Sequence, residues 1–326
     1  MRKIIKIVTI LMLLGSFKAS SEDAPTPSGS ASIQAEIKVS IGDTFGIFKR
    51  INPAHYNIQY PDFYMLETEV TNAMFKEYLA ATGKRKDDTD VLEIVSSKRA
   101  TTTVSAIYSI QDKSAIWHDN KYPQGQDNRP VVMITFLDAQ AFCKWLSETH
   151  PELGLFRLPT WNEWMIAAYG SNRRYPWGDK WDRNLAHTYY GYWGTEWNWH
   201  TEEVKSRPDG RTPEGLYGML GNVSEYIAEK DSTSKDYLNP GSRWMGGAFN
   251  SGCTEYSDVP HPPRKDYWGY SHSAVNRDDS IGFRIILDTK KDMSLLKRAR
   301  VFAQNNKSWM IKPAPEKSTA ETKTDK

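Results

Sequence analysis

The sequence predicts a single α+β domain with low regular secondary structure, and three observations lead to that prediction. Helices are expected to begin at three threonines that can cap them, Thr71, Thr135 and Thr160. Residues 171–281 instead carry many Gly, Pro, Asn and Asp residues between Trp and Tyr, which is typical of short strands and ordered loops. No internal repeat with a period of roughly 20 to 50 residues is visible, which argues against a solenoid or a propeller.

The N-terminal end predicts export. Basic residues come first, an apolar stretch follows at residues 7–14, and small residues stand at 19–21, which is the order of a secretory signal peptide over residues 1–21. The mature chain is therefore expected in the periplasm or outside the cell. The alternative is a short buried N-terminal helix. Residues 22–35 are too polar to bury much apolar surface and are predicted to be a disordered linker.

The C-terminal end predicts a further extension. Apolar residues recur near helical spacing within residues 289–311, beside several basic side chains. This spacing indicates a basic helix that packs on the domain, and the alternative is a weakly helical tail. Residues 312–326 resemble the N-terminal linker in composition and are predicted to be disordered. The folded domain is therefore expected over residues 36–288.

Composition and charge argue against several classes of protein. The 326 residues include 42 Lys and Arg against 40 Asp and Glu, so no strong positive field is present to attract nucleic acid. After the signal peptide, no apolar run is long enough to span a membrane. Two cysteines are too few for a Cys₄ zinc site, and the seven histidines lack the spacing of a zinc motif. The 12 Trp, 17 Tyr and 11 Phe residues predict an aromatic core.

The first and third predicted helices have clear ends. The first follows Thr71 and is expected to stop at Gly83, where glycine permits the left-handed conformation. The third follows a capping box formed by Thr160 and Glu163, and it is expected to end at Gly170.

The second predicted helix decides the environment of one cysteine. Thr135 and Asp138 fit a capping box with a short acid, and apolar residues then recur at helical spacing from Phe136 to Leu146. Cys143 is one of these apolar positions. It is therefore predicted to lie in the core.

Seven segments with distinctive composition occur along the chain in a fixed order. They are ETEVTNAMFKEYLAATG (67–83), RPVVMITFLDAQAFCKWL (129–146), RLPTWNEW (157–164), YPWGD (175–179), GLYGMLGNVSEY (215–226), RWMGGAF (243–249) and IGFR (281–284). Together they resemble the formylglycine-generating enzyme, or sulfatase-modifying factor, family over roughly residues 37–288. The resemblance implies a sulfatase-modifying-factor domain related to the C-type lectin architecture, in agreement with the α+β prediction.

The resemblance also implies a redox centre whose residues are absent here. Oxidase members of the family convert a sulfatase cysteine to formylglycine with O₂, and they use two cysteines that hold copper. Counted from the Gly246-Gly247 turn, those two positions are Ser251 and Tyr256 in this chain. Cys253 lies between them. Copper is therefore not expected, and any oxidase chemistry would depend on Cys253.

Three other positions depart from the oxidase pattern. Ala248 replaces the Ser of the family's Gly-Gly-Ser turn, and Ser224 replaces a Trp. Ile285 stands where oxidase members can carry a Cys that pairs with the helix cysteine matching Cys143. Cys143 is therefore predicted to be free and buried.

Structural calcium is the cofactor that the resemblance implies. The backbone carbonyls of Gly221 and Val223 and the carboxylate of Glu225 fall at ligand positions, and Asn184 resembles the start of a second calcium loop. The acid or amide expected three residues before Gly221 has become Gly218, which removes a ligand. The alternative is that Glu225 only satisfies the loop backbone.

Residues 250–280 predict a recognition surface. This segment places rigid aromatic residues among short polar ones, a mixture that suits adaptable binding. The alternative is an ordered loop with an aromatic core of its own. The predicted binding residues are Ser251, Tyr256, Tyr267, Trp268 and Tyr270.

Three hypotheses of function follow. The first is an exported, non-catalytic binding or accessory module that recognises a protein or glycan, with a sulfatase among the candidate partners. The second is a formylglycine-generating oxidase that acts on sulfatase cysteines through Cys253. The third is a structural subunit of a cell-envelope assembly. The absence of paired cysteines favours the first hypothesis.

Overall fold

The computed structural model of this chain describes residues 34–86, 108–109, 117, 120–171, 173–188, 200–228, 243–250 and 277–289. These residues begin and end close to the predicted domain limits of 36 and 288. The predicted signal peptide and C-terminal tail lie outside the described residues, as do nearly all of the predicted linker and the predicted basic helix.

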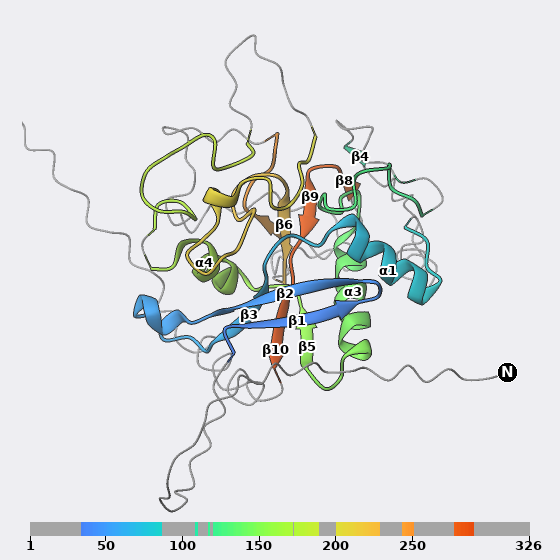
Figure 1. Cartoon of the computed structure of the whole chain (residues 1–326), viewed down its shortest axis with the longest axis horizontal. Helices are drawn as coiled ribbons and strands as arrows, with labels where there is room; N and C mark the ends of the chain where they lie inside the picture. The colour runs from blue at the N-terminus through green and yellow to red at the C-terminus, as the bar shows by residue number, and fades with distance from the viewer. Residues whose placement is uncertain are drawn as a thin grey trace, which may run out of the picture. The chain divides into compact units, whose positions relative to one another are not determined.

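A five-stranded sheet joins the two ends of the domain (Figure 1). Its strand order is β1-β2-β3-β10-β5, and every neighbouring pair is antiparallel. Leu287 pairs with Tyr64 on one side and with Phe156 on the other, so the last strand is central in the sheet. The strands are β1 (Glu36–Ile41), β2 (Thr44–Ile51), β3 (Phe63–Leu66), β10 (Ile286–Thr289) and β5 (Gly154–Arg157).

The β1–β2 hairpin depends on a glycine at its turn. Ile41 pairs with Thr44, and Gly42 between them has a φ of 58°, in the left-handed region. A Cβ at Gly42 would lie 1.9 Å from Oε2 of Glu77, so the turn also lacks space for a side chain. Along β1, Val39 and Ile41 are buried and their neighbours are exposed. This alternation shows which face of the hairpin meets the core.

Helix α1 (Asn72–Thr82) begins and ends as the sequence predicts. The hydroxyl of Thr71 accepts a hydrogen bond from the amide of Met74, which satisfies one of the free N–H groups at the helix start. The helix stops at Gly83, whose φ of 69° is left-handed. Helix α1 contacts both β1 and β2.

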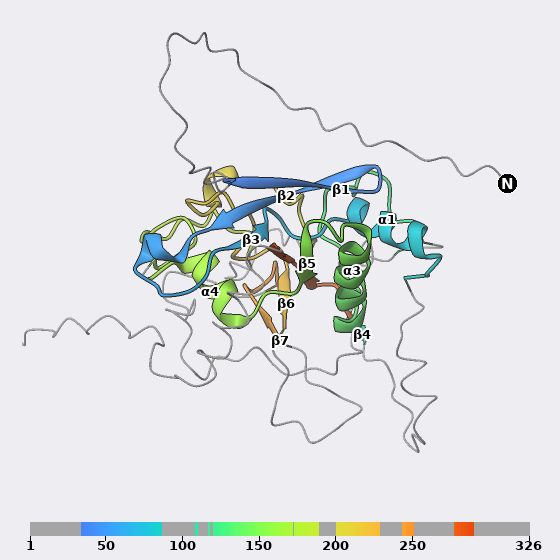
Figure 2. The same ribbon diagram turned by 90° about the horizontal axis from the view of Figure 1, so that it is seen from below.

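Helices α3 (Phe136–Thr149) and α4 (Trp161–Tyr169) both begin with complete capping boxes. The capping pairs are those predicted, with an acid at the third helical position in each case. Helix α3 packs on β5 and beside α1, and α4 lies apart from that pair (Figure 2). Within the described residues, no helix combines the length and apolar character needed to cross a membrane.

Two smaller sheets complete the described strands. β6 (Ser224–Ile227) pairs in parallel with β9 (Ile281–Phe283) and antiparallel with β7 (Arg243–Met245). β4 (Tyr108–Ser109) pairs in parallel with β8 (Arg277–Asp278). Short strands and long connecting segments dominate the described chain, so the predicted α+β fold class is confirmed.

Aromatic side chains fill the main core, as the composition predicts. The ring centroid of Phe142 lies 5.9 Å from that of Phe75, 5.7 Å from Tyr78 and 5.5 Å from Phe283. Cys143 belongs to the same cluster and is only 4% exposed, which confirms the predicted core position. Aromatic side chains bury on the order of 150–250 Å² each, so they supply much of the apolar burial of this core.

Candidate functional site

A buried ion pair joins the GNVSEY loop to the IGFR segment. Arg284 and Glu225 are both fully buried, and the Arg284 guanidinium donates to both carboxylate oxygens of Glu225 at 2.7–3.1 Å. Trp164 donates its indole N–H to Oε2 of Glu225 at 2.8 Å. Each carboxylate oxygen of Glu225 thus accepts two hydrogen bonds, which uses its hydrogen-bonding capacity.

Arg284 also binds three backbone carbonyls. Its Nη1 and Nη2 groups donate to the carbonyls of Leu66, Glu67 and Tyr217 at 2.6–3.1 Å. All the guanidinium donors are therefore used, and the side chain ties the end of β3 to the loop before β6. Burial by itself would lower the pKa of Arg284, but Glu225 and other nearby carboxylates raise it above its ordinary value.

Glu69 is a second buried carboxylate in this cluster. Its Oε1 accepts a hydrogen bond from Nδ2 of Asn222 at 3.0 Å, and its Oε2 has no hydrogen-bond partner among the described residues. Burial raises the pKa of Glu69 to about 7; Arg284 opposes this effect and the charge of Glu225 adds to it. When both carboxylates are ionised, they share one guanidinium, so the cluster carries an excess negative charge.

Gly218 leaves room for the Glu69 carboxylate. A Cβ at Gly218 would lie 2.4 Å from Oε1 and 2.7 Å from Oε2 of Glu69, closer than atoms can approach. The backbone φ of Gly218 is 67°, which also favours glycine. The acid or amide that the resemblance implies at position 218 is absent, and the Glu69 carboxylate occupies the space that its side chain would need.

A small polar pocket lies beside the same cluster. Its lining includes Gly218 and Asn222, and also His187, Glu202 and Arg207. The space open to water is about 20 Å³, and one water molecule needs about 10–15 Å³. Arg207 donates to Glu202 at 2.6 Å, which holds both side chains in place.

The predicted calcium ligands lie in different surroundings. Gly221 and Val223 are buried just before β6, whereas Asn184 is exposed. Among the described residues, no group of three His, Cys, Asp or Glu side chains is close enough to hold a metal ion. A calcium ion at Glu225 would have to displace a donor already bound there. Within this cluster, Oε2 of Glu69 is the carboxylate oxygen without a hydrogen-bond partner among the described residues.

Glu69 was not predicted as a site residue from the sequence. It lies close to the half-buried Glu67 in the same segment, and nothing local to the sequence distinguishes the two acids. A weaker signal is available from Arg284, which is a lone charge in the apolar run IGFRII and therefore requires a buried acidic partner. That signal indicates a partner but not which acid it is.

Replacing Glu69 with Gln is expected to remove a pH dependence of stability. A carboxyl whose pKa rises from 4.5 to about 7 on folding binds its proton more tightly in the folded state. Its contribution is therefore complete below pH 4.5 and is lost as the pH rises to about 7. The loss amounts to roughly 3 kcal/mol. Urea unfolding of metal-free protein across this range measures it, and Glu69→Gln should lose less stability than the parent.

The control for this experiment is Glu148→Gln. The Glu148 side chain is 63% exposed, so its replacement should leave the pH profile of the parent unchanged. Superimposable profiles for the parent and Glu69→Gln would contradict the assignment of a raised pKa to Glu69.

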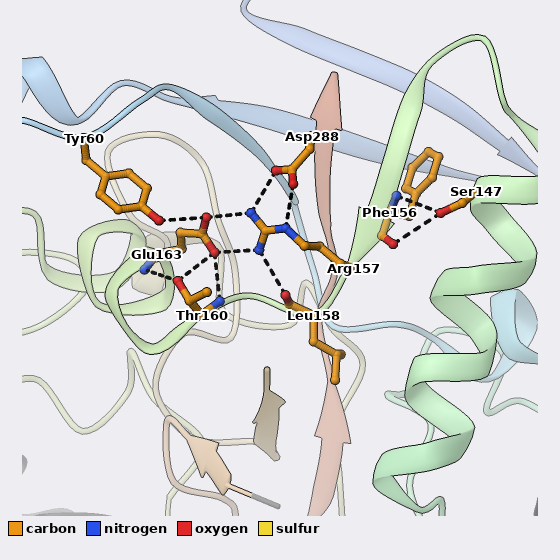
Figure 3. Close-up of polar contacts among 8 residues, drawn as sticks. All are labelled: Tyr60, Ser147, Phe156, Arg157, Leu158, Thr160, Glu163 and Asp288. Carbon is orange, nitrogen blue, oxygen red and sulfur yellow. Dashed lines mark hydrogen bonds and ion pairs between the residues drawn. The ribbon is translucent and has the colours of Figure 1, made fainter. Parts of the chain in front are cut away.

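A second ion-pair network holds the RLPT segment (Figure 3). Arg157 donates to both carboxylate oxygens of Asp288 at 2.7 and 2.8 Å and to both of Glu163 at 2.7 and 2.6 Å. Tyr60 donates its hydroxyl to Glu163 at 3.0 Å, and Thr160 donates through its amide and hydroxyl. These side chains come from different elements and point toward one another, so the network joins β5, β10 and the start of α4.

The thiol of Cys143 is enclosed in the core. Burial raises the pKa of Cys143 far above its ordinary value, so the thiol stays protonated. Ile285 is fully buried in the same core cluster. Ser224 and Ala248, the other two departures from the oxidase pattern, are also buried. A protonated, enclosed thiol is neither a nucleophile nor a metal ligand.

The predicted recognition segment begins and ends at residues held by the described chain. The amide of Phe249 donates to the carbonyl of Asn222 at 3.0 Å, and the Phe249 ring lies 6.4 Å from that of His187. Arg277 donates to the carbonyl of Met133 at 2.7 Å. The site residues predicted between these ends all lie outside the described residues: Ser251, Cys253, Tyr256, Tyr267, Trp268 and Tyr270.

Comparisons with known proteins agree with this architecture. The family model described as "Sulfatase-modifying factor enzyme 1-like domain" matches residues 10–289. The formylglycine-generating enzyme of Streptomyces coelicolor is 29% identical over 258 residues, which cover 67% of this chain and 78% of that protein. The inactive C-alpha-formylglycine-generating enzyme 2 of Bos taurus is 29% identical over 130 residues, which cover 37% of this chain and 40% of that protein.

A solved structure supports the fold. The structure described as "Crystal Structure of CarF" has a TM-score of 0.51 and 20% sequence identity to this chain. The likeness covers 78% of this chain and 94% of that one. At this level of identity it shows a shared fold, which confirms the fold expected from the sequence.

Proposed function

This chain belongs to the family of sulfatase-modifying factor enzyme 1-like proteins, and from that premise we propose that it is an exported, non-catalytic member that binds a protein or glycan. Its relatives include formylglycine-generating enzymes and also proteins named as inactive, so membership is compatible with either activity. Export is proposed from the signal peptide predicted over residues 1–21.

The observation that carries the proposal is the position of Cys143. The chain has two cysteines, and Cys143 is enclosed in helix α3. Cys253 is therefore the single thiol left for the segment where the resemblance implies a copper-holding pair. Copper(I) prefers soft thiolate ligands, and two are needed to hold it linearly. Copper and oxidase chemistry are for this reason not part of the proposed function.

The proposed binding surface is formed by residues 250–280. The described chain holds Phe249 before this segment and Arg277 near its end through hydrogen bonds to Asn222 and Met133. Fixed ends restrict the conformations of a segment, which reduces the entropy lost when it binds a partner. The aromatic and short polar residues of this segment suit recognition of a protein or a glycan, and a sulfatase is one candidate partner.

A double variant, Tyr267→Ala with Trp268→Ala, tests the binding surface. Partners that co-purify with the exported protein should be lost from the double variant, while its melting temperature stays that of the parent. Stoichiometric partners retained by the double variant would instead favour a structural subunit of a cell-envelope assembly.

Calcium is proposed as a structural cofactor with Glu69 as its carboxylate ligand. Glu69 lies against Gly218 and accepts a hydrogen bond from Asn222, which stands between the predicted ligands Gly221 and Val223 in the sequence. Its oxygen without a partner and the excess negative charge of the cluster both suit a hard cation that takes oxygen ligands. When bound, calcium would supply the positive charge that Arg284 alone does not.

Chelation is expected to lower the melting temperature at neutral or higher pH. A ligand that binds only the folded state stabilises it by about 2.7 kcal/mol when the ligand concentration is about a hundred times its Kd. Adding calcium to chelated protein should restore the parent and Glu148→Gln, but it should leave Glu69→Gln unchanged. Identical melting curves of the parent with and without chelator would remove calcium from the account.

A further inference from the structure

Three aromatic rings form a cluster apart from the two main cores, packed on Ala186 and Leu220. The rings of Tyr175 and Trp177 stack almost in parallel, with centroids 5.4 Å apart and planes 9° apart. The Trp181 ring lies 5.3 Å from Tyr175 and 6.0 Å from Trp177. Tyr175 is buried, whereas both indoles are only half-buried. The cluster therefore keeps part of each Trp at the surface.

The rings are held rigidly. Tyr175 and Gly178 exchange two backbone hydrogen bonds, at 2.8 and 3.1 Å, which closes a tight turn with Trp177 inside it. The indole N–H of Trp177 donates to the carbonyl of Lys180 at 2.9 Å. The only polar group of that indole is thus satisfied within the loop, so the orientation of the ring is set before any ligand arrives.

The surroundings of the cluster are polar. Arg174 and Asp179 are exposed beside it, and the Arg174 guanidinium lies 5.7 Å from the centre of the Tyr175 ring. Leu220 packs in the cluster and also lines the polar pocket that contains Glu202 and Arg207. Leu220 is thus shared by the cluster and by a pocket whose lining offers carboxylate acceptors and guanidinium donors.

We propose that Trp177 and Trp181 form a saccharide-binding surface. A sugar ring has a flat face of C–H groups that can stack on an indole, and hydroxyl groups at its edge that both donate and accept hydrogen bonds. The cluster supplies the first kind of contact, and the exposed side chains of Arg174 and Asp179 beside it supply a donor and an acceptor for the second. The inference rests on the proposed function as a binding module, and it names the class of ligand and a surface separate from residues 250–280.

The described geometry favours a saccharide over a peptide. Peptides are recognised by an exposed strand edge, an apolar groove for a helix, or aromatic grooves for polyproline segments. Around this cluster the described chain forms two isolated bridges, Tyr175 with Gly178 and His187 with Gly221, and no strand. The adjoining pocket is polar and has space of about 20 Å³, which is too small for an apolar anchor side chain.

Three soluble probes test the inference: cellohexaose, maltohexaose and chitohexaose. Binding is measured by calorimetry and by quenching of tryptophan fluorescence. We expect at least one probe to bind the parent, and we expect Trp177→Ala and Trp181→Ala each to weaken that binding about tenfold or more. Trp177→Phe keeps an apolar ring and should lose less affinity. Thermal melting confirms that each variant is folded.

The control is Glu148→Gln, whose side chain is 63% exposed on helix α3 outside the cluster, and it should bind the oligosaccharide as the parent does. Failure of all three probes to bind the parent would overturn the inference, and so would equal affinities of the parent, Trp177→Ala and Trp181→Ala. Oligosaccharide binding lost only in the Tyr267/Trp268 double variant would overturn it too, and would leave the proposed function standing.

Discussion

Replacing Arg284 with Met is expected to destabilise the protein by about 3–5 kcal/mol, because it leaves the buried carboxylates of Glu225 and Glu69 without a cation. The carbonyls of Leu66, Glu67 and Tyr217 lose their donors in the same change. In a domain of this size each kcal/mol shifts the melting temperature by roughly 2–4 °C, so a fall of about 10 °C is expected. Thermal unfolding followed by circular dichroism measures this change.

Two further variants separate charge from packing. Arg284→Met combined with Glu225→Met replaces the pair by apolar side chains and should recover part of the loss. Lys144→Met breaks an ion pair whose side chains are 74% and 63% exposed, and it should cost less than about 1 kcal/mol. Equal effects of Arg284→Met and Lys144→Met would show that the buried pair does not hold the fold together.

Replacing Arg157 with Met is the second large effect, and about 3–5 kcal/mol is again expected. The change removes the guanidinium from Glu163, which is fully buried, and from Asp288, which is 3% exposed. It also removes the link between β5, β10 and the capping box of α4. Arg157→Lys should lose an intermediate amount, because an ammonium group cannot reproduce two bidentate contacts.

The pH dependence of unfolding at acid pH tests this network independently. Burial would raise the pKa of Glu163, but the charge and hydrogen bonds of Arg157 lower it below the ordinary value of 4.5. The stabilisation from this pair is therefore complete above pH 4.5 and is lost as the pH falls toward the lower folded value. Arg157→Met should lack this acid-dependent loss. If Arg157→Met loses as much stability as the parent when the pH falls below 4.5, Arg157 is not the group that lowers the pKa of Glu163.

The helices could be predicted because their signals are local. Thr71, Thr135 and Thr160 each lie within three residues of the backbone group that they cap, so the sequence alone contains both partners. The core position of Cys143 followed from helical spacing for the same reason. The order of the five-stranded sheet was not predicted, because it depends on pairings such as Leu287 with Tyr64 between distant parts of the chain.

The partners of the buried charges could not be predicted from neighbouring residues in the sequence. Arg284 and Glu225 are separated by 59 residues, and Glu69 and Asn222 by 153. Glu225 was predicted as a calcium ligand through a family resemblance, and in the structure Arg284 and Trp164 donate hydrogen bonds to its carboxylate. Glu69 was missed because burial, and not residue type, sets it apart from neighbouring acids.

The recognition segment was predicted from its residue types alone. Its ends at Phe249 and Arg277 are described, and the aromatic residues between them are not. Oxidase activity is not expected because Cys143 is enclosed in the core, which leaves Cys253 without a second thiol.

Mass spectrometry of a sulfatase-derived peptide tests this claim most directly. The peptide carries the target cysteine and is incubated with copper(I)-treated protein in air. The mass of the peptide is expected to stay unchanged with the parent protein, as with Cys253→Ala. Formylglycine formed by the parent, lost on Cys253→Ala and retained on Cys143→Ala, would contradict the account and establish a catalytic oxidase that works through Cys253.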